Sequence, residues 1–122
     1  MKVFFDGGSR PCTTGMELAI VTGGRSIIKR DLGQGTSMDA EWLALIEAMR
    51  HAREHDLIDP LLLGDAAAVI AQANGTARCP PSCAGHLRVF QALPRPQGRV
   101  RIRYVKRSQN LAGIALARLH DR

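Results

Sequence analysis

Apolar and polar residues at the start of the chain follow a pattern that predicts β-strands. In residues 2–6, both faces of the predicted strand carry apolar side chains, which is typical of a central strand in a sheet. Residues 17–22 and 25–31 predict two more strands. Gly23-Gly24 between them suits a type I′ turn, because glycine accepts positive φ without steric cost. The first third of the chain therefore predicts one strand followed by a β-hairpin.

After the hairpin, helical and strand-like periods alternate. Thr36 followed by Asp39 has the pattern of a capping box, so we expect a helix from here to about Glu54. Further strands are expected at 60–65 and 99–106, and further helices at 66–73, 82–93 and 109–119. The order βββαβααβα predicts a single α/β domain over residues 1–122, with a five-stranded mixed sheet and helices on both of its faces.

Three carboxylates stand where burial would normally exclude a charge. Asp6 and Asp65 each close an apolar strand, and Glu41 lies in the first turn of the predicted helix, on its apolar face. If the first and fourth strands are parallel neighbours, their carboxyl ends meet at one edge of the sheet. Because buried charges are costly unless paired or metal-bound, the three residues indicate a site for a hard cation such as Mg²⁺ or Mn²⁺. Taken singly, they are also ordinary strand-end turn formers and a helix-dipole partner.

The charge of the chain points to a polyanionic partner. Lysine and arginine number 17 against 11 acidic residues, which gives a net charge of +6 and a pI near 10. Arg99, Arg101 and Arg103 alternate with apolar residues, so the fifth strand should carry a basic stripe that Lys106 and Arg107 extend. Duplex phosphates would bind such a stripe, although charges also protect an edge strand from aggregation. The few aromatic residues argue against a stacking platform for single strands.

The sequence contains weaker signals for the cellular location of the protein and for other metal-binding residues. The three cysteines form an odd set, and the N-terminus lacks the pattern of a signal peptide, so we expect a cytoplasmic protein. No apolar run is long enough to cross a membrane. His51 and His55 share one side of a helix, but they are expected on its solvated face. Cys79 and Cys83 are expected to be free or structural thiols rather than zinc ligands.

Five segments of the sequence resemble the ribonuclease H family. They are Val3-Phe4-Phe5-Asp6-Gly7-Gly8-Ser9, Ala40-Glu41-Trp42-Leu43-Ala44-Leu45, Leu63-Gly64-Asp65, and residues 70–75 and 105–112. The segments appear in the family's order and spacing over nearly the whole chain. The closest resemblance is to the short bacterial, archaeal and plant-type ribonuclease H-like domains.

The resemblance implies a Mg²⁺-dependent endonuclease, with Mn²⁺ as a substitute ion, that hydrolyses the RNA strand of RNA–DNA hybrids by a two-metal-ion mechanism. Asp6, Glu41 and Asp65 match three of the family's four catalytic, metal-binding carboxylates, with Asp6 bridging both ions and a metal-bound water as nucleophile. By the same resemblance, Gly7, Gly8 and Ser9 bring backbone amides close to the nucleic acid, and Asn74 and Gly75 contact the hybrid.

The sequence departs from the family where the fourth carboxylate is expected, because Gly113 stands there. Asp121 lies eight residues further on, about 12 Å along a helix, and is too distant to replace it. Gln109 or Asn110 could offer a neutral oxygen instead, and the loop at 106–109 lacks the family's histidine. Two alternatives therefore stay open beside the nuclease: a catalytically silent nucleic-acid-binding module with the same fold, and an unrelated α/β small-ligand binder.

Overall fold

The computed structural model describes residues 1–120. Five strands, four α-helices and two short 3₁₀ helices follow one another in the predicted order. They are β1 Lys2–Arg10, β2 Gly15–Thr22, β3 Arg25–Lys29, α1 Ser37–Glu54, β4 Leu61–Gly64, α2 Ala67–Ala73, η1 Pro81–Cys83, α3 Ala84–Ala92, β5 Arg101–Tyr104, η2 Arg107–Gln109 and α4 Leu111–Arg118. Within the described residues, none of the helices has the length and apolar character needed to span a membrane.

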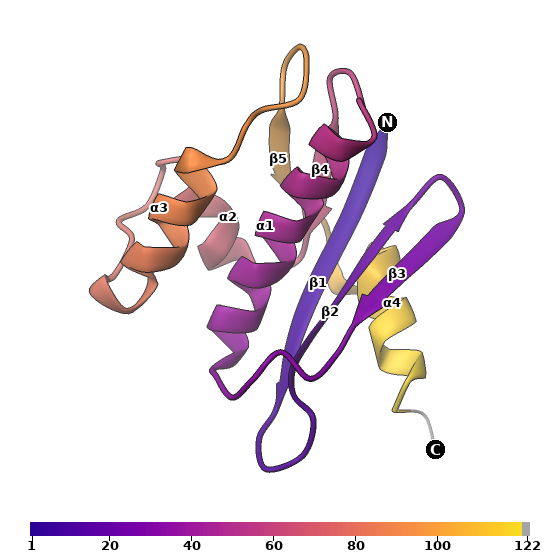
Figure 1. Cartoon of the computed structure of the whole chain (residues 1–122), viewed down its shortest axis with the longest axis vertical. Coiled ribbons are helices and arrows are strands. Elements are labelled where there is room, and N and C mark those ends of the chain that lie inside the picture. The colour runs from indigo at the N-terminus through magenta and orange to yellow at the C-terminus, as the bar shows by residue number, and fades with distance from the viewer. Residues whose placement is uncertain (121–122) are drawn as a thin grey trace.

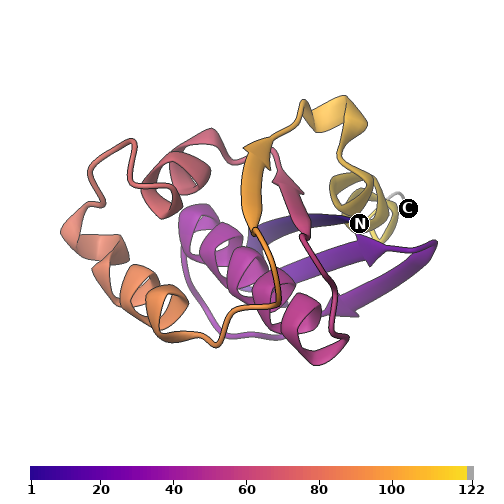
Figure 2. The same ribbon diagram turned by 90° about the horizontal axis from the view of Figure 1, so that it is seen from above.

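The strands form one mixed sheet in the order β3-β2-β1-β4-β5. β1, β2 and β3 are antiparallel neighbours, whereas β4 pairs in parallel with both β1 and β5. Helices α1, α2 and α3 cover one face of the sheet and α4 covers the other, as Figures 1 and 2 show. The predicted five-stranded mixed sheet with helices on both faces is confirmed.

β1 is longer than predicted, and this changes the position of Asp6. The strand runs to Arg10 because Gly7-Gly8-Ser9-Arg10 continues to pair with β2 as far as Gly15. Asp6 therefore lies inside β1 and does not close it. β4, however, pairs with β1 only as far as Phe4, so β1 has an open edge from Asp6 onward. The sequence concealed this extension because glycines disfavour strands.

The other differences are at the ends of elements. β5 spans four residues where eight were predicted, because the chain after Tyr104 leaves the sheet and turns into η2. The last two predicted helices each begin two residues later, after a 3₁₀ turn. Gly23 and Gly24 have φ of +56° and +76°, as a type I′ turn requires.

The main core lies between the sheet and α1. Trp42 is fully buried there, and its Nε1 donates a hydrogen bond to Oε1 of Gln72 on α2 at 3.1 Å. Trp42 is therefore a core residue. β2 is buried along its whole length because Leu18 and Ile20 face this core while alternate residues face α4.

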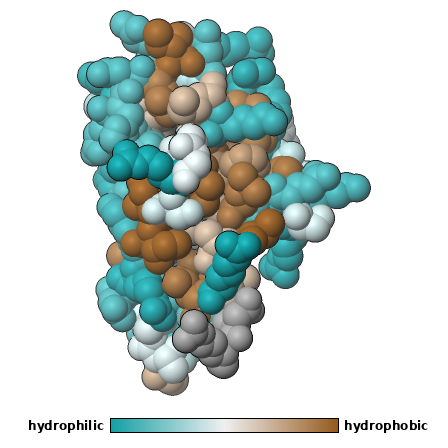
Figure 3. Space-filling view, turned by 90° about the vertical axis from the view of Figure 1, so that its right-hand side faces the viewer, coloured by the Kyte–Doolittle hydropathy of each residue, from teal (hydrophilic) through white to brown (hydrophobic). Residues whose placement is uncertain are grey.

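The face carrying α4 is less completely covered. α4 is only eight residues long, and apolar side chains gather at the centre of this side of the molecule in Figure 3. Leu111, Ile114 and Leu119 on and after α4 are 38–47% exposed. Burial is therefore strongest on the α1 side, which fixes the sheet.

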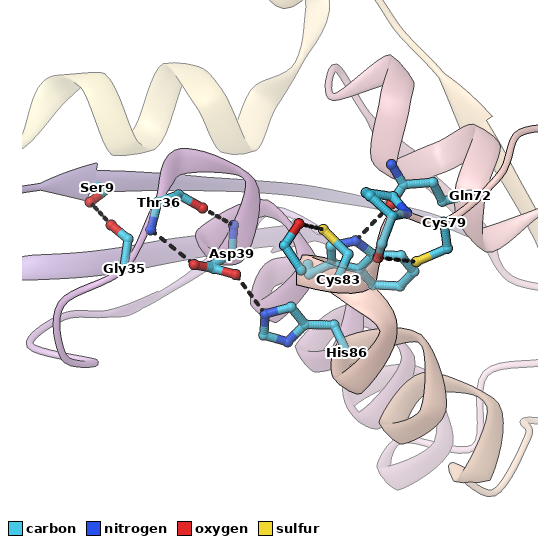
Figure 4. Close-up of polar contacts among 11 residues, drawn as sticks. Ser9, Gly35, Thr36, Asp39, Gln72, Cys79, Cys83 and His86 are labelled. Atoms are coloured by element: carbon cyan, nitrogen blue, oxygen red, sulfur yellow. Dashed lines mark hydrogen bonds and ion pairs between the residues drawn. The ribbon is translucent and has the colours of Figure 1, made fainter.

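A network of polar contacts fixes the start of α1 (Figure 4). The Thr36 side chain accepts a hydrogen bond from the Asp39 amide, and the Asp39 carboxylate accepts one from the Thr36 amide, so the predicted capping box is confirmed. His86 on α3 bonds the same carboxylate at 2.9 Å. Ser9 on β1 donates to the Gly35 carbonyl at 2.6 Å. These contacts join β1, α1 and α3 close to Glu41.

Replacing Gly7 by alanine tests the close approach of β1 to α1. A Cβ at position 7 would lie 2.1 Å from the Ala40 carbonyl oxygen. Gly7→Ala should therefore lower the free energy of unfolding by about 2–3 kcal/mol, measured by urea denaturation. Gly8→Ala is the matched control, because its Cβ would meet only Leu116 at 3.7 Å. Equal stabilities for the two variants would contradict the predicted contact.

Candidate functional site

The structure brings the three predicted carboxylates together. Asp6, Glu41 and Asp65 each offer one oxygen, and these oxygens all lie within 4.8 Å of one another. None of the three forms an ion pair with a lysine, arginine or histidine among residues 1–120. Three oxygen donors without a basic partner fit a hard divalent cation.

Three different elements position these side chains. Asp6 lies on β1 just beyond the last residue that pairs with β4, and Asp65 directly follows β4, so the two parallel strands deliver both aspartates to one point. Glu41 is five residues after the N-cap Thr36 and so begins the second turn of α1. The sequence analysis had placed it in the first turn. Its Oε1 accepts a hydrogen bond from the Gly7 amide at 2.6 Å.

Asn110 holds the arrangement together from the α4 side. Its side chain is fully buried, and its Nδ2 donates to the Phe5 carbonyl at 3.0 Å and to Asp65 Oδ2 at 3.2 Å. Its Oδ1 accepts from the Ala112 amide and so caps α4. The oxygen of Asn110 is thus already used, and the residue positions Asp65 instead of offering the neutral ligand that the sequence suggested.

Burial and mutual repulsion make the metal-free cluster hold protons. Burial raises the pKa of Glu41 to about 8, and the nearby Asp6 carboxylate adds to the increase. Burial also raises the pKa of Asp6 to about 6, with the negative charge of Asp65 as the second cause. A cation would stabilise the ionised forms, so the site is poised to exchange protons for metal.

The cluster opens into a cleft of about 940 Å³. Gly7, Gly8, Ser9 and Arg107, all predicted nucleic-acid contacts, line it together with the carboxylates. The Gly7 amide and the Phe5 carbonyl point away from β2, so by strand alternation the backbone groups of Ser9 also face the open edge of β1. The cleft therefore combines anionic side chains with backbone donors and an arginine.

Gly113 lies directly over the carboxylates. A Cβ at this position would be 3.4 Å from Asp6 Oδ2 and 3.6 Å from Asp65 Oδ2. These are ordinary van der Waals distances, so a side chain at position 113 would stand in contact with both aspartates. Ile114, the next residue, also lines the cleft and is 38% exposed, so it is a second position from which a carboxylate can approach the cluster. Asp121 lies outside the described residues.

Several predicted nucleic-acid contacts lie outside this cleft. Asn74 uses its Nδ2 to bond the Ile102 carbonyl on β5 at 2.9 Å, and Gly75 forms the turn after α2 with φ of +75°. Arg103 is exposed on β5 and Arg101 is half-buried there, whereas Lys106 follows the strand. Because β5 is an edge strand, these charges suit both phosphate contact and edge protection.

Two residues of the cleft were not recognised in the sequence. Glu17 on β2 and His120 after α4 both line it and are bonded to each other. The available signal was the position of Glu17, a lone acidic residue in the otherwise apolar strand Gly15–Thr22. The partner could not be identified, because 103 residues separate the two in sequence.

Removing the Asn110 side chain should loosen both the helix and the cluster. Asn110→Ala loses the cap of α4 and the bonds to Phe5 and Asp65, so we expect a loss of about 2–4 kcal/mol in unfolding free energy. Mn²⁺ affinity, measured by calorimetry, should fall as well. Asn74→Ala removes one bond near the surface and should cost about 1 kcal/mol without changing Mn²⁺ affinity. Unchanged Mn²⁺ affinity in Asn110→Ala would argue against its positioning role.

The raised pKa values predict that the metal-free protein loses stability as pH rises. The unfolded chain releases these protons near the ordinary pKa values of 3.8 for Asp6 and 4.5 for Glu41, whereas the folded state retains them up to about 6 and about 8. Over this range the folded state binds more protons than the unfolded chain, so the free energy of unfolding falls with pH. Thermal unfolding in EDTA should show this decline. Glu41→Gln should flatten it, and Mn²⁺ should stabilise the wild type more at pH 8 than at pH 5. A melting temperature that rises from pH 5 to pH 8 would contradict the raised pKa values.

Comparisons with known proteins agree with the fold. A family model described as reverse transcriptase-like matches residues 14–120. A search of curated proteins found no match. The structure is similar to that of RNase H1 from the halophilic archaeon Halobacterium salinarum NRC-1, with 26% identity, a TM-score of 0.73, and coverage of 99% of this chain and 98% of that chain.

Two further solved structures share the fold. The N-terminal RNase H domain of Rv2228c from Mycobacterium tuberculosis, solved as a fusion with maltose-binding protein, has 23% identity, a TM-score of 0.71, and coverage of 98% of this chain and 96% of that chain. LC11-RNase H1, solved in complex with an RNA/DNA hybrid, has 17% identity, a TM-score of 0.68, and coverage of 90% and 88%. The chain therefore belongs to the reverse transcriptase-like family and has the ribonuclease H fold, which confirms the resemblance seen in its sequence.

Proposed function

We propose that the protein is a Mg²⁺-dependent endonuclease that hydrolyses the RNA strand of RNA–DNA hybrids. The observation that carries the proposal is the convergence of Asp6, Glu41 and Asp65 in an open cleft of a ribonuclease H fold. The net charge of +6 favours a nucleic acid as substrate. The solved complex of LC11-RNase H1 with an RNA/DNA hybrid supports this class of substrate.

The three carboxylates are the residues that would hold divalent cations, with Mn²⁺ as a substitute for Mg²⁺. Bound ions of this kind lower the pKa of a coordinated water and stabilise the charge that develops on the leaving oxygen. Asn110 would keep Asp65 in place during this reaction, and the Gly7 amide would hold Glu41.

The open edge of β1 and Arg107 would bind the substrate strand. The backbone groups of Ser9 face this edge, and Arg107 lines the cleft near Asp6. An arginine and a backbone amide are both good donors to phosphate oxygens. Arg101, Arg103 and Lys106 would contact the duplex further from the cluster. We also propose a cytoplasmic location for the protein.

A catalytically silent nucleic-acid-binding module is the second candidate, and one observation favours it. The side of the cleft formed by α4 offers Gly113 and Ile114, neither of which carries a carboxylate. Three ligands hold two cations less firmly than four, so cleavage would be slow or absent while the basic surface still bound a duplex.

Cleavage of a labelled RNA–DNA hybrid in Mg²⁺ and in Mn²⁺ separates the two candidates. We expect the wild type to cut and Asp65→Asn to lose at least about 100-fold in rate, because the loss of a ligand removes charge stabilisation from the site. Gly113→Asp and Ile114→Asp should be compared in parallel. Each introduced aspartate should raise the rate, because position 113 lies within van der Waals distance of Asp6 and Asp65 and position 114 lines the same cleft.

The control variant is Glu54→Gln, which changes a carboxylate at the last residue of α1, far along the helix from Glu41. It should cut at the wild-type rate. Cutting that appears only after an aspartate is introduced at 113 or 114 would favour the silent module. Failure of every variant to cut or to bind the hybrid would refute both candidates and leave the small-ligand binder.

A further inference from the structure

Buried Glu17 and half-buried His120 form a pair in the same cleft as the carboxylate cluster. Glu17 is only 2% exposed, and its Oε2 accepts a hydrogen bond from His120 Nε2 at 2.5 Å. Arg30 lies 3.5 Å from the other carboxylate oxygen, which also accepts a bond from Thr14. The negative charge of Glu17 is thus already met by Arg30, before any charge on His120 is counted.

The second nitrogen of His120 remains available to a ligand. Nδ1 makes no hydrogen bond within residues 1–120, and it is not among the fully buried polar atoms that lack a partner. The side chain as a whole is 18% exposed, and it lines the cleft. With Nε2 bonded to Glu17, a protonated imidazole ring can donate a second hydrogen bond from Nδ1 to an anion.

The pair lies beside the cluster but is not part of it. Glu17 is opposite Gly8, and Asp6 is opposite Ala19, so Asp6 and Glu17 are diagonal neighbours on the same face of the sheet. His120 follows the end of α4, and Gly113 near the start of that helix lies beside Asp6 and Asp65. Neither Glu17 nor His120 belongs to the group of ligand atoms that lie within 4.8 Å of one another. The imidazole therefore lines the same cleft from outside the carboxylate cluster.

The local charges favour an anion over a cation. Arg10, exposed at the end of β1, lines the same end of the cleft, and Arg30 lies beside Glu17. A cation would be repelled by both arginines, and the pair offers too few ligands for a metal. A buried ion pair is also a weak source of stability, since apolar replacements are often neutral or stabilising. Anchoring α4 is therefore an incomplete explanation for its presence.

We propose that His120, oriented by Glu17, binds a backbone phosphate of the nucleic acid that is near, but distinct from, the cleaved phosphate. This inference rests on the proposed function, since it assumes that a nucleic-acid strand lies along the cleft. It makes His120 a binding residue and Glu17 a positioning residue. Gly8, which lacks a side chain opposite Glu17, leaves room for the strand to approach.

Methylphosphonate scanning of an RNA–DNA hybrid tests the inference. Each phosphate near the cut site is neutralised in turn, and binding is measured by fluorescence anisotropy in the Asp65→Asn background, in Mg²⁺, so that the hybrid stays intact. The proteins compared are this background alone and the same background with His120→Gln, Glu17→Gln, Arg107→Ala or His55→Gln. His55 is exposed on the far end of α1 and serves as the control.

We expect His120→Gln to weaken binding about three- to tenfold and to reduce the slope of log affinity against log salt by about 1. One neutralised phosphate should weaken the Asp65→Asn protein but cause no further loss in His120→Gln.

Three results would overturn the inference. His120→Gln could bind like the control while Arg107→Ala weakens binding, which would leave the proposed function intact. His120→Gln could weaken binding equally at every phosphate position, with a lower melting temperature, which would make the pair a structural anchor only. Absence of salt-dependent hybrid binding even by the wild type in Ca²⁺ would refute the proposed function, and this inference with it.

Discussion

The close approach of β1 to α1 at Gly7 is the contact on which the site depends. With no side chain at this position, the strand passes so near the helix that the Gly7 amide bonds Glu41 directly. The same approach keeps Asp6, one residue earlier, within ligand distance of Glu41. The start of α1, fixed by the Thr36 and Asp39 cap and by His86, supplies the opposing surface. The cluster is thus a consequence of backbone packing more than of the carboxylates themselves.

Ionisation of the half-buried carboxylates in this cluster is energetically unfavourable. Desolvation raises the pKa of Asp6 and Glu41, so part of the negative charge is neutralised by protons when no cation is bound. An ionised site of this kind is less stable without a cation than with one. Such a loss of stability at a functional site is common in proteins. The Asn110 amide partly compensates the negative charge of Asp65, because it donates a hydrogen bond to Oδ2 without competing for metal.

The sequence predicted the order of elements and the three carboxylates, since strand and helix periods and strand-end aspartates are local signals. It did not predict that β1 continues through Gly7 and Gly8, because only the pairing with β2 overrides the low strand preference of glycine. The double role of Asn110 and the partnership of Glu17 with His120 were also hidden. Both depend on contacts between residues more than 40 positions apart, which no local pattern contains.

α4 touches the two ends of the cleft through its own two ends. Asn110 at its start donates a hydrogen bond to the Phe5 carbonyl beside the cluster, and His120 just past its end bonds Glu17. Because each helical residue turns the helix by about 100°, both contacts can exist only for a helix of this length. The number of residues between Asn110 and His120 is therefore constrained by the helical rotation. Gain or loss of a single residue between them would rotate one contact out of the cleft while the other stayed in place.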